Sequence, residues 1–225
     1  MAVLEGGVSG ELLGVGAQAA SPLHATLMHL PYGSGGVFRL GTTTGTIAAA
    51  LAANSELFQF RYVTATSRVC LVHRVTVSAA LNAAATAAGL SSLRMCMARS
   101  WTADGTGGTA LTLSGDNCQL RTSMATTEVT SARIATTAAL GVGTKTLDAT
   151  DLVSVIMGVG TGALTVGFNT TLVPDTQLFG SQDGSGHPLV LAHQEGFVIR
   201  SGLIMPATMT WGLSVNVVWS EVSSY

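Results

Sequence analysis

The stretch of sequence that decides the fold is HPLVLAHQEGFVIRSGLIMPATMTWGLSVNVVWSEVSSY, which runs from His187 to Tyr225. Within it, large apolar side chains recur at every second position: Trp211, Leu213, Val215, Val217 and Trp219. Small or polar residues occupy the opposite positions: Gly212, Ser214, Asn216 and Ser220. A period of two is typical of a strand with one buried face. We interpret the stretch as two half-buried strands that form a hairpin, joined by a connection rich in glycine and proline.

The same alternation occurs earlier in the chain. In residues 57–62, Phe58, Phe60 and Tyr62 share a face opposite Gln59 and Arg61. In residues 69–79, one face carries Val69, Leu71, His73, Val75 and Val77, and the other carries Arg74, Thr76 and Ser78. Leu93, Met95 and Met97 alternate with Arg94 and Cys96. Shorter strands are predicted over residues 37–46, 110–113, 119–124, 129–136, 145–147, 152–157 and 163–168.

No long segment has a helical period of 3.6 residues. Residues 47–53, IAAALAA, have a helix-forming composition but are too short for a stable helix, and residues 81–89 are predicted to be a loop. Many short strands separated by turn residues predict an all-β, antiparallel β-sandwich, most simply a jelly roll. Residues 1–36, rich in Gly, Ala and Ser, predict an extended N-terminal arm, and residues 37–225 predict a single sandwich domain.

The chain is unusually poor in charge. Charged residues make up 10% of the 225 residues, with one lysine, Lys145, and nine scattered arginines. This pattern predicts no nucleic-acid partner, because such a partner requires a basic cluster. Low charge fits either a membrane protein or a subunit that hides its surface against copies of itself or a partner. The longest uncharged segment, Leu152 to Pro174, is interrupted by glycines and hydroxyl residues, so we predict no membrane span.

The start of the chain and the cysteines point to a reducing compartment. Glu5 and Glu11 lie where a secretory signal would carry basic and apolar residues, so we expect synthesis in the cytoplasm. Cys70, Cys96 and Cys118 are widely spaced and odd in number, without a CxxC pair. We therefore predict buried, unreactive thiols rather than a zinc site or disulfides.

Two motifs suggest chemistry, and each has a simpler interpretation. Residues 158–163, GVGTGA, match the GxGxxA fingerprint of dinucleotide-binding proteins, but no helix-forming segment follows, so a hairpin turn is favoured. His187, His193 and Glu195 are candidate metal ligands, but Pro188 interrupts the strand that would align them and no third strong ligand follows. We expect these three residues to be exposed or at an interface.

The remaining candidates also favour structural roles. His24 and His29 lie among prolines and glycines, and His73 is expected to be a hydrogen-bonded core or interface histidine. Asn169 begins a glycosylation sequon that has no meaning without secretion. No nucleophile signature frames the Ser, His and Asp residues, so we do not predict an enzyme. Trp101, Trp211 and Trp219 are expected to be core or interface anchors rather than a stacking surface for sugars or bases. No catalytic, cofactor-binding or metal-binding residue is assigned.

Several segments of the chain resemble a family of small bacteriophage structural proteins. The segments are 45–62, 99–103, 107–113, 120–124, 137–147, 187–192, 195–200 and 206–222, with the motifs RSWTA at 99–103, TAALGVGTKTL at 137–147 and EGFVIR at 195–200. The chain departs from the pattern at Met209, where the family has glycine. We therefore expect the turn before the last strand to differ in type from that of the family.

The resemblance implies a capsid decoration, or cement, protein on the outer surface of the virion. It implies the major capsid protein as partner and a homo-oligomer, most simply a trimer, with no cofactor. Low charge suits such contacts, because charged residues are depleted at interface centres. The alternatives are a tail or fibre component, either a connector or a receptor-binding tip, a small hydrolase, and a carbohydrate-binding sandwich.

Overall fold

A computed structural model describes residues 3–6, 11–14, 36–63, 68–86, 88–120, 124–129, 131–159, 161, 171–180 and 187–223. Within these residues the chain forms β-strands and no helix. The all-β prediction is therefore confirmed. Consistently, no helix capable of spanning a membrane occurs in the described part of the chain.

The chain divides into two compact units, Met1–Leu30 and Pro31–Tyr225. In the first unit, β1 (Val3–Gly6) pairs antiparallel with β2 (Glu11–Gly14), a hairpin that the sequence analysis did not predict. The extended arm over residues 1–36 remains a prediction. All other strands belong to the second unit.

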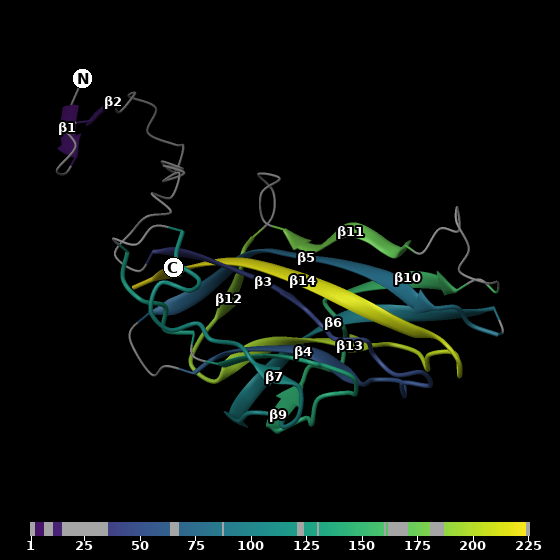
Figure 1. Ribbon diagram of the computed structural model, residues 1–225. Coiled ribbons are helices and arrows are strands. Elements are labelled where there is room, and N and C mark those ends of the chain that lie inside the picture. The colour runs from purple at the N-terminus through teal and green to yellow at the C-terminus, as the bar shows by residue number, and fades with distance from the viewer. Residues whose placement is uncertain are drawn as a thin grey trace. The chain divides into compact units, whose positions relative to one another are not determined.

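The second unit consists of two antiparallel sheets packed together as a sandwich (Figure 1). The seven-stranded sheet has the order β10 (Val153–Val159), β6 (Gly89–Ala103), β13 (Glu195–Ser201), β4 (Glu56–Tyr62), β8 (Ser131–Ile134) and β7 (Thr109–Ala110), with β9 (Thr144–Leu147) also on β6. The five-stranded sheet has the order β11 (Thr171–Gly180), β5 (Val69–Ala83), β14 (Thr210–Val222) and β3 (Val37–Thr43), with β12 (Leu189–Leu191) also on β5. The predicted β-sandwich is confirmed, while the jelly-roll connectivity remains a prediction.

The core lies between the sheets, and β14 supplies its largest side chains. Trp211, Leu213, Val215, Val217 and Trp219 are all buried, as their spacing predicts. The Trp219 ring stacks on Phe38 of its own sheet at 5.6 Å between centroids. It also meets the ring of Phe60, in the opposite sheet, edge-on at 5.2 Å. This aromatic cluster therefore ties the two sheets together.

The prediction that the last two strands form a hairpin is wrong. Strand β13 lies in the seven-stranded sheet between β4 and β6, whereas β14 lies in the five-stranded sheet between β3 and β5. Residues 202–209 therefore cross from one sheet to the other. Each strand has its hydrogen-bonding partners far away in sequence, so a local pattern cannot reveal the pairing. Met209, at the end of this crossing, is buried in the core, and its φ is not positive, so glycine is not required there.

Strand β5 contains a bulge that changes which residues face the core. Val218 of β14 pairs with Arg74 and Trp219 pairs with Val72, so His73 is the extra residue. A bulge of this kind shifts the alternation by one position. Cys70 and Val72, rather than Val69 and Leu71, therefore share the core with Val75 and Val77. The predicted face of residues 69–72 is wrong for this reason.

Residues 47–53, predicted to be too short for a stable helix, form turns and an isolated bridge, with Ala50 at a positive φ of 55°. The predicted loop over 81–89 is partly wrong, because β5 continues to Ala83 and β6 begins at Gly89. The predicted strand at 163–168 lies outside the described residues.

Part of the outer face of the seven-stranded sheet, around β4 and β13, is also covered. Phe58, Phe60 and Tyr62 face the core as predicted, but Gln59 and Arg61 on the opposite face of β4 are buried as well. A small second apolar cluster lies on this face, formed by Cys96, Ala98, Trp101 and Val198 with Leu147 packed against it. The five-stranded sheet, by contrast, has exposed positions along its outer face.

Candidate binding face

The outer face of the five-stranded sheet forms a regular lattice of side chains. Strand β14 runs along its middle, and the register places β3 on one side and β5 on the other. Ser214 lies between Thr43 and Ser78, and Asn216 lies between Gly41 and Thr76. These residues are small and uncharged, so the backbone of the sheet is accessible to a partner. We call this surface the lattice face.

Two arginines stand at one end of the lattice face. Val218 of β14 pairs with Arg39 of β3 on one side and with Arg74 of β5 on the other. Two strand spacings separate the arginine Cα atoms, or about 10 Å. Both arginines are exposed, and neither forms an ion pair within the described residues. Two unpaired guanidinium groups on one face favour a partner that carries carboxylates, which guanidinium binds in bidentate geometry.

A polar hollow of about 530 Å³ adjoins the arginine pair. Its walls are formed by Arg39, Leu40, Gly41, Arg74, Thr76, Thr112, Leu113, Asn117, Asp175, Asn216, Val217 and Val218. One wall comes from the loop before Cys118, whose carbonyl accepts a 2.9 Å hydrogen bond from the Arg39 amide. Asn216 donates to Thr76 Oγ1 at 3.4 Å across the floor. Amide and hydroxyl groups thus surround the two cations, an arrangement suited to a polar, acidic ligand surface.

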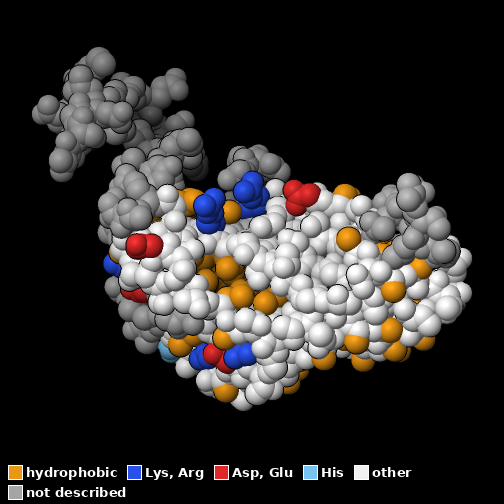
Figure 2. Space-filling view, in the orientation of Figure 1, with side chains coloured by type: hydrophobic (Ala, Val, Ile, Leu, Met, Phe, Trp, Pro, Cys, Tyr) orange, Lys and Arg blue, Asp and Glu red, His pale blue; other side chains and the backbone are white. Residues whose placement is uncertain are grey.

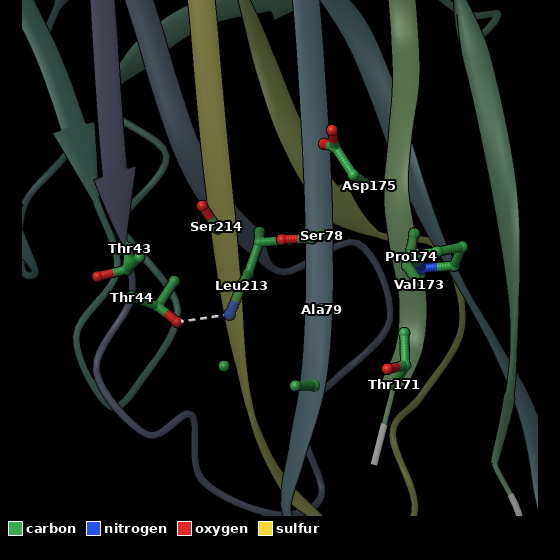
Figure 3. Close-up of a pocket in the computed structure, with 12 residues that line it drawn as sticks. Thr43, Thr44, Ser78, Ala79, Thr171, Val173, Pro174, Asp175, Leu213 and Ser214 are labelled. Atoms are coloured by element: carbon green, nitrogen blue, oxygen red, sulfur yellow. Dashed lines mark hydrogen bonds between the residues drawn. The ribbon is translucent and has the colours of Figure 1, made fainter. Parts of the chain in front are cut away.

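A second hollow, of similar volume at about 530 Å³, continues along the same face (Figure 3). Figure 3 shows Thr43, Thr44, Ser78 and Ser214 around it, with Asp175 and Pro174 on β11. Thr44 Oγ1 accepts a 2.9 Å hydrogen bond from the Leu213 amide and so fixes the end of β3 against β14. Asp175 lines both hollows and is the only acidic residue in either lining. The face is thus shallow, mostly neutral and extended, which suits contact with a protein surface.

The only lysine lies beneath the opposite surface and has a structural role. Lys145 Nζ lies 2.8 Å from Glu56 Oε2, and the two side chains are 2% and 1% exposed. Gln59 donates to the same Glu56 oxygen at 2.6 Å, and Nζ lies 4.5 Å from the centroid of the Trp101 ring. A buried amine held by a carboxylate and a ring has no access to a substrate. This cluster fastens the covering loops to the outer face of the seven-stranded sheet.

The surroundings of the three cysteine thiols do not favour the reactive thiolate form. Cys96 donates to Asp151 Oδ1 at 2.5 Å, and Asp151 also pairs with Arg200 at 2.9 Å. Burial, followed by the hydrogen bond to Asp151, raises the pKa of Cys96 to about 12. Burial likewise raises the pKa of Cys118 to about 11 and that of Cys70 well above its ordinary value. All three cysteines are free and buried, as predicted.

The candidate metal ligands are not brought together. His193 lies in the turn after β12, while Glu195 begins β13 and bonds to Arg99 at 2.8 Å and to the Ala192 amide at 2.9 Å. His187 is exposed, and its Nδ1 lies 2.7 Å from the carbonyl of Pro188. Among the described residues, no three His, Cys, Asp or Glu side chains are grouped to hold a metal ion.

The remaining candidates from the sequence are His73, the glycine-rich motif and the three tryptophans. His73 forms a 2.7 Å hydrogen bond with Ser220 Oγ beside the β5 bulge. In the glycine-rich motif, Gly158 and Val159 end β10, and most of the remainder lies outside the described residues, as do His24, His29 and Asn169. Trp101, Trp211 and Trp219 are all fully buried, which removes them as a sugar-stacking surface.

The arginine pair could not be found from sequence alone. Arg39 and Arg74 are 35 positions apart and belong to strands that meet only through β14. The one hint in the sequence was that Arg74 lies on the face of its strand opposite the apolar residues, where a side chain can be exposed.

No family model, curated protein or solved structure matches the chain.

Proposed function

We propose that the protein is a virion structural protein that decorates the outer surface of a bacteriophage capsid and stabilises contacts between capsid subunits. The observation that carries this proposal is the lattice face, with its unpaired Arg39 and Arg74 beside a polar hollow. Among the described residues, the face offers polar binding groups spread over two open hollows rather than one enclosed cavity. The resemblance of several segments to phage structural proteins supplies the class of partner.

The physical basis of binding would be contact over a wide area rather than capture of a small ligand. Small side chains such as Ser214 and Thr76 let a partner backbone approach the sheet closely. Each arginine would bind a carboxylate of the major capsid protein, and such charge-assisted bonds contribute about 1.5–3 kcal/mol each. Figure 2 shows arginine side chains above a surface that is otherwise mostly uncharged. Low surface charge limits the cost of removing water from the rest of the contact.

The proposal is tested by sedimenting the full chain with capsids that lack it. The double variant Arg39→Gln with Arg74→Gln should weaken binding at least tenfold, since losing about 1.4 kcal/mol corresponds to a factor of ten. Arg133→Gln is the matched control, because Arg133 lies on β8 of the other sheet and bonds to the Gly107 carbonyl. Its affinity should be unchanged. Equal binding by the double variant and the natural protein would contradict the role of the lattice face.

The position of the protein in the particle tests the function itself. Electron cryomicroscopy of the virion should show many copies on the shell, in contact with capsid subunits. A few copies at the vertex or tail would contradict decoration and support the tail or fibre alternative.

A further inference from the structure

An apolar patch lies on the outer face of the seven-stranded sheet, at the end formed by β6 and β10. It consists of Leu90 and Ile156, which are 65% and 71% exposed. In the register of β6 and β10, Ile156 lies opposite Ser92, and Gly158 lies opposite Leu90. Ile156 and Leu90 are therefore diagonal neighbours on one face.

The connection after β13 carries two further exposed aliphatic residues, Leu203 and Ile204, which are 44% and 66% exposed. The Gly202 amide donates to the Ser92 carbonyl at 2.7 Å, and Ser91 Oγ donates to the Leu203 carbonyl at 3.4 Å. These bonds hold the start of the connection against β6. Exposed aliphatic side chains that lie together on a surface are typical of an interaction site.

Strand β10 is also an edge strand without the usual protection. Its sequence, VSVIMGV, contains no charge and no proline, and it pairs with β6 through seven residues without a register shift. Within the described residues, β6 is the only strand hydrogen-bonded to it. Natural proteins protect free edges, because an unprotected edge pairs with other chains.

The other edges of the sandwich carry such protection. Strand β11 contains Pro174, Asp175 and three irregularities of register. Strand β3 carries Arg39 and is bridged at Phe38 by Gln119. Strand β7 has only two residues. The contrast indicates that the bare edge of β10 is an interface.

We propose that β10 pairs antiparallel with β10 of a second copy of this chain, around a two-fold axis at Ile156. When a strand pairs with the same strand of a second copy, the contact is isologous, so its sequence must be complementary to itself. In this register Val153 lies opposite Val159, Ser154 opposite Gly158, and Val155 opposite Met157. None of these pairs brings two like charges together, because β10 contains no charged residue. The two Ile156 side chains lie side by side, and the two apolar patches join.

This contact does not depend on the capsid. It forms an even-numbered assembly, so the trimer that the family resemblance implies would require another surface. Pairing satisfies the free backbone groups of both edges and buries Ile156, which would otherwise remain exposed to water.

The oligomeric state of the purified full chain tests this contact. Light scattering after size-exclusion chromatography should give a dimer at micromolar concentration. Ile156→Lys should give a monomer, because two ammonium groups would meet at the axis. The control Val142→Lys changes an apolar loop residue of similar exposure, 61% against 71% for Ile156, and should remain dimeric. A monomeric or trimeric natural protein, or a dimeric Ile156→Lys variant, would overturn the proposal.

A cross-link tests the register. Directly opposed residues of an antiparallel pair have Cα atoms about 4.5–5.5 Å apart, which a disulfide spans. Mild oxidation should therefore link the Ile156→Cys variant into a covalent dimer and leave Val142→Cys unlinked. A dimer that Ile156→Cys does not cross-link would contradict the two-fold axis at this residue. The Arg39→Gln, Arg74→Gln variant should remain dimeric, so failure of the capsid proposal would leave this result unchanged.

Discussion

At the scale of single residues, the most informative groups are the buried polar side chains. Glu221 lies near the end of β14 and is fully buried. Its carboxylate accepts hydrogen bonds from Thr127 Oγ1 at 2.5 Å, from the Glu128 amide at 2.9 Å and from Trp219 Nε1 at 3.3 Å. It thereby fastens residues 127–129 to the sandwich. The sequence shows only an acid near the end of a strand, since the loop that buries it is about 90 residues away.

Glu221 leads to a prediction about pH. Burial raises the pKa of Glu221 in the folded protein, although its hydrogen bonds partly oppose this effect. In the unfolded chain the pKa is close to the ordinary glutamate value, about 4.3. As pH rises from below that value through the folded pKa, the unfolded state loses its proton first and gains stability. The free energy of unfolding of the natural protein, relative to Glu221→Gln, should therefore fall as pH rises from about 4 through the folded pKa.

The measurement is urea denaturation of both proteins across this pH range. All other titrating groups are shared by the two proteins, so the difference isolates Glu221. A difference that is constant or grows with pH would contradict the assignment.

At the scale of elements, β14 shows how a strand divides its two faces. Trp219 contacts Phe38 and Phe60 and joins the two sheets, whereas Asn216 stands exposed on the lattice face. The alternation in sequence correctly predicts this division for residues 211–219. It does not predict the partners of the strand, nor the bulge at His73, because both depend on strands far away in the chain.

The two faces of β14 should differ strongly in their response to truncation. Trp219→Ala should lower the free energy of unfolding by about 3–5 kcal/mol, because it leaves a cavity between the sheets. Asn216→Ala, three positions away, should change it by less than about 0.5 kcal/mol. Chemical denaturation monitored by circular dichroism gives both values. Similar losses for the two variants would mean that the face assignment is wrong.

At the scale of the whole molecule, the sandwich encloses its cysteines and its lysine. Cys70, Cys96 and Cys118 are enclosed, and Lys145 is buried with Glu56. What remains outside, in the described part of the chain, includes the lattice face and the apolar patch beside β10.

The cysteines provide a prediction for the molecule as a whole. Because burial raises the pKa of all three thiols and excludes reagents, a disulfide reagent at pH 8 should label none of them in the folded protein. After denaturation it should label all three. The labelling rate in native buffer should equal the rate of unfolding. A thiol that reacts faster than the protein unfolds would show that its part of the sandwich opens separately.

The sequence by itself determined the fold class, most of the strand positions and the inward faces of β4, β6 and β14. These features depend on residues close together in the chain, since a period of two places alternate side chains on opposite faces. The burial of the tryptophans and cysteines follows from the same local chemistry.

Only the tertiary structure decided which strands pair and what the surfaces carry. β13 and β14 are consecutive but lie in different sheets, because each bonds to strands distant in sequence. The placement of Arg39 and Arg74 on either side of Val218, the burial of Lys145 and the position of β10 at an edge of the described sheet arise in the same way. Hydrogen bonding between strands and packing between sheets act over any separation along the chain, and so a local sequence pattern cannot specify them.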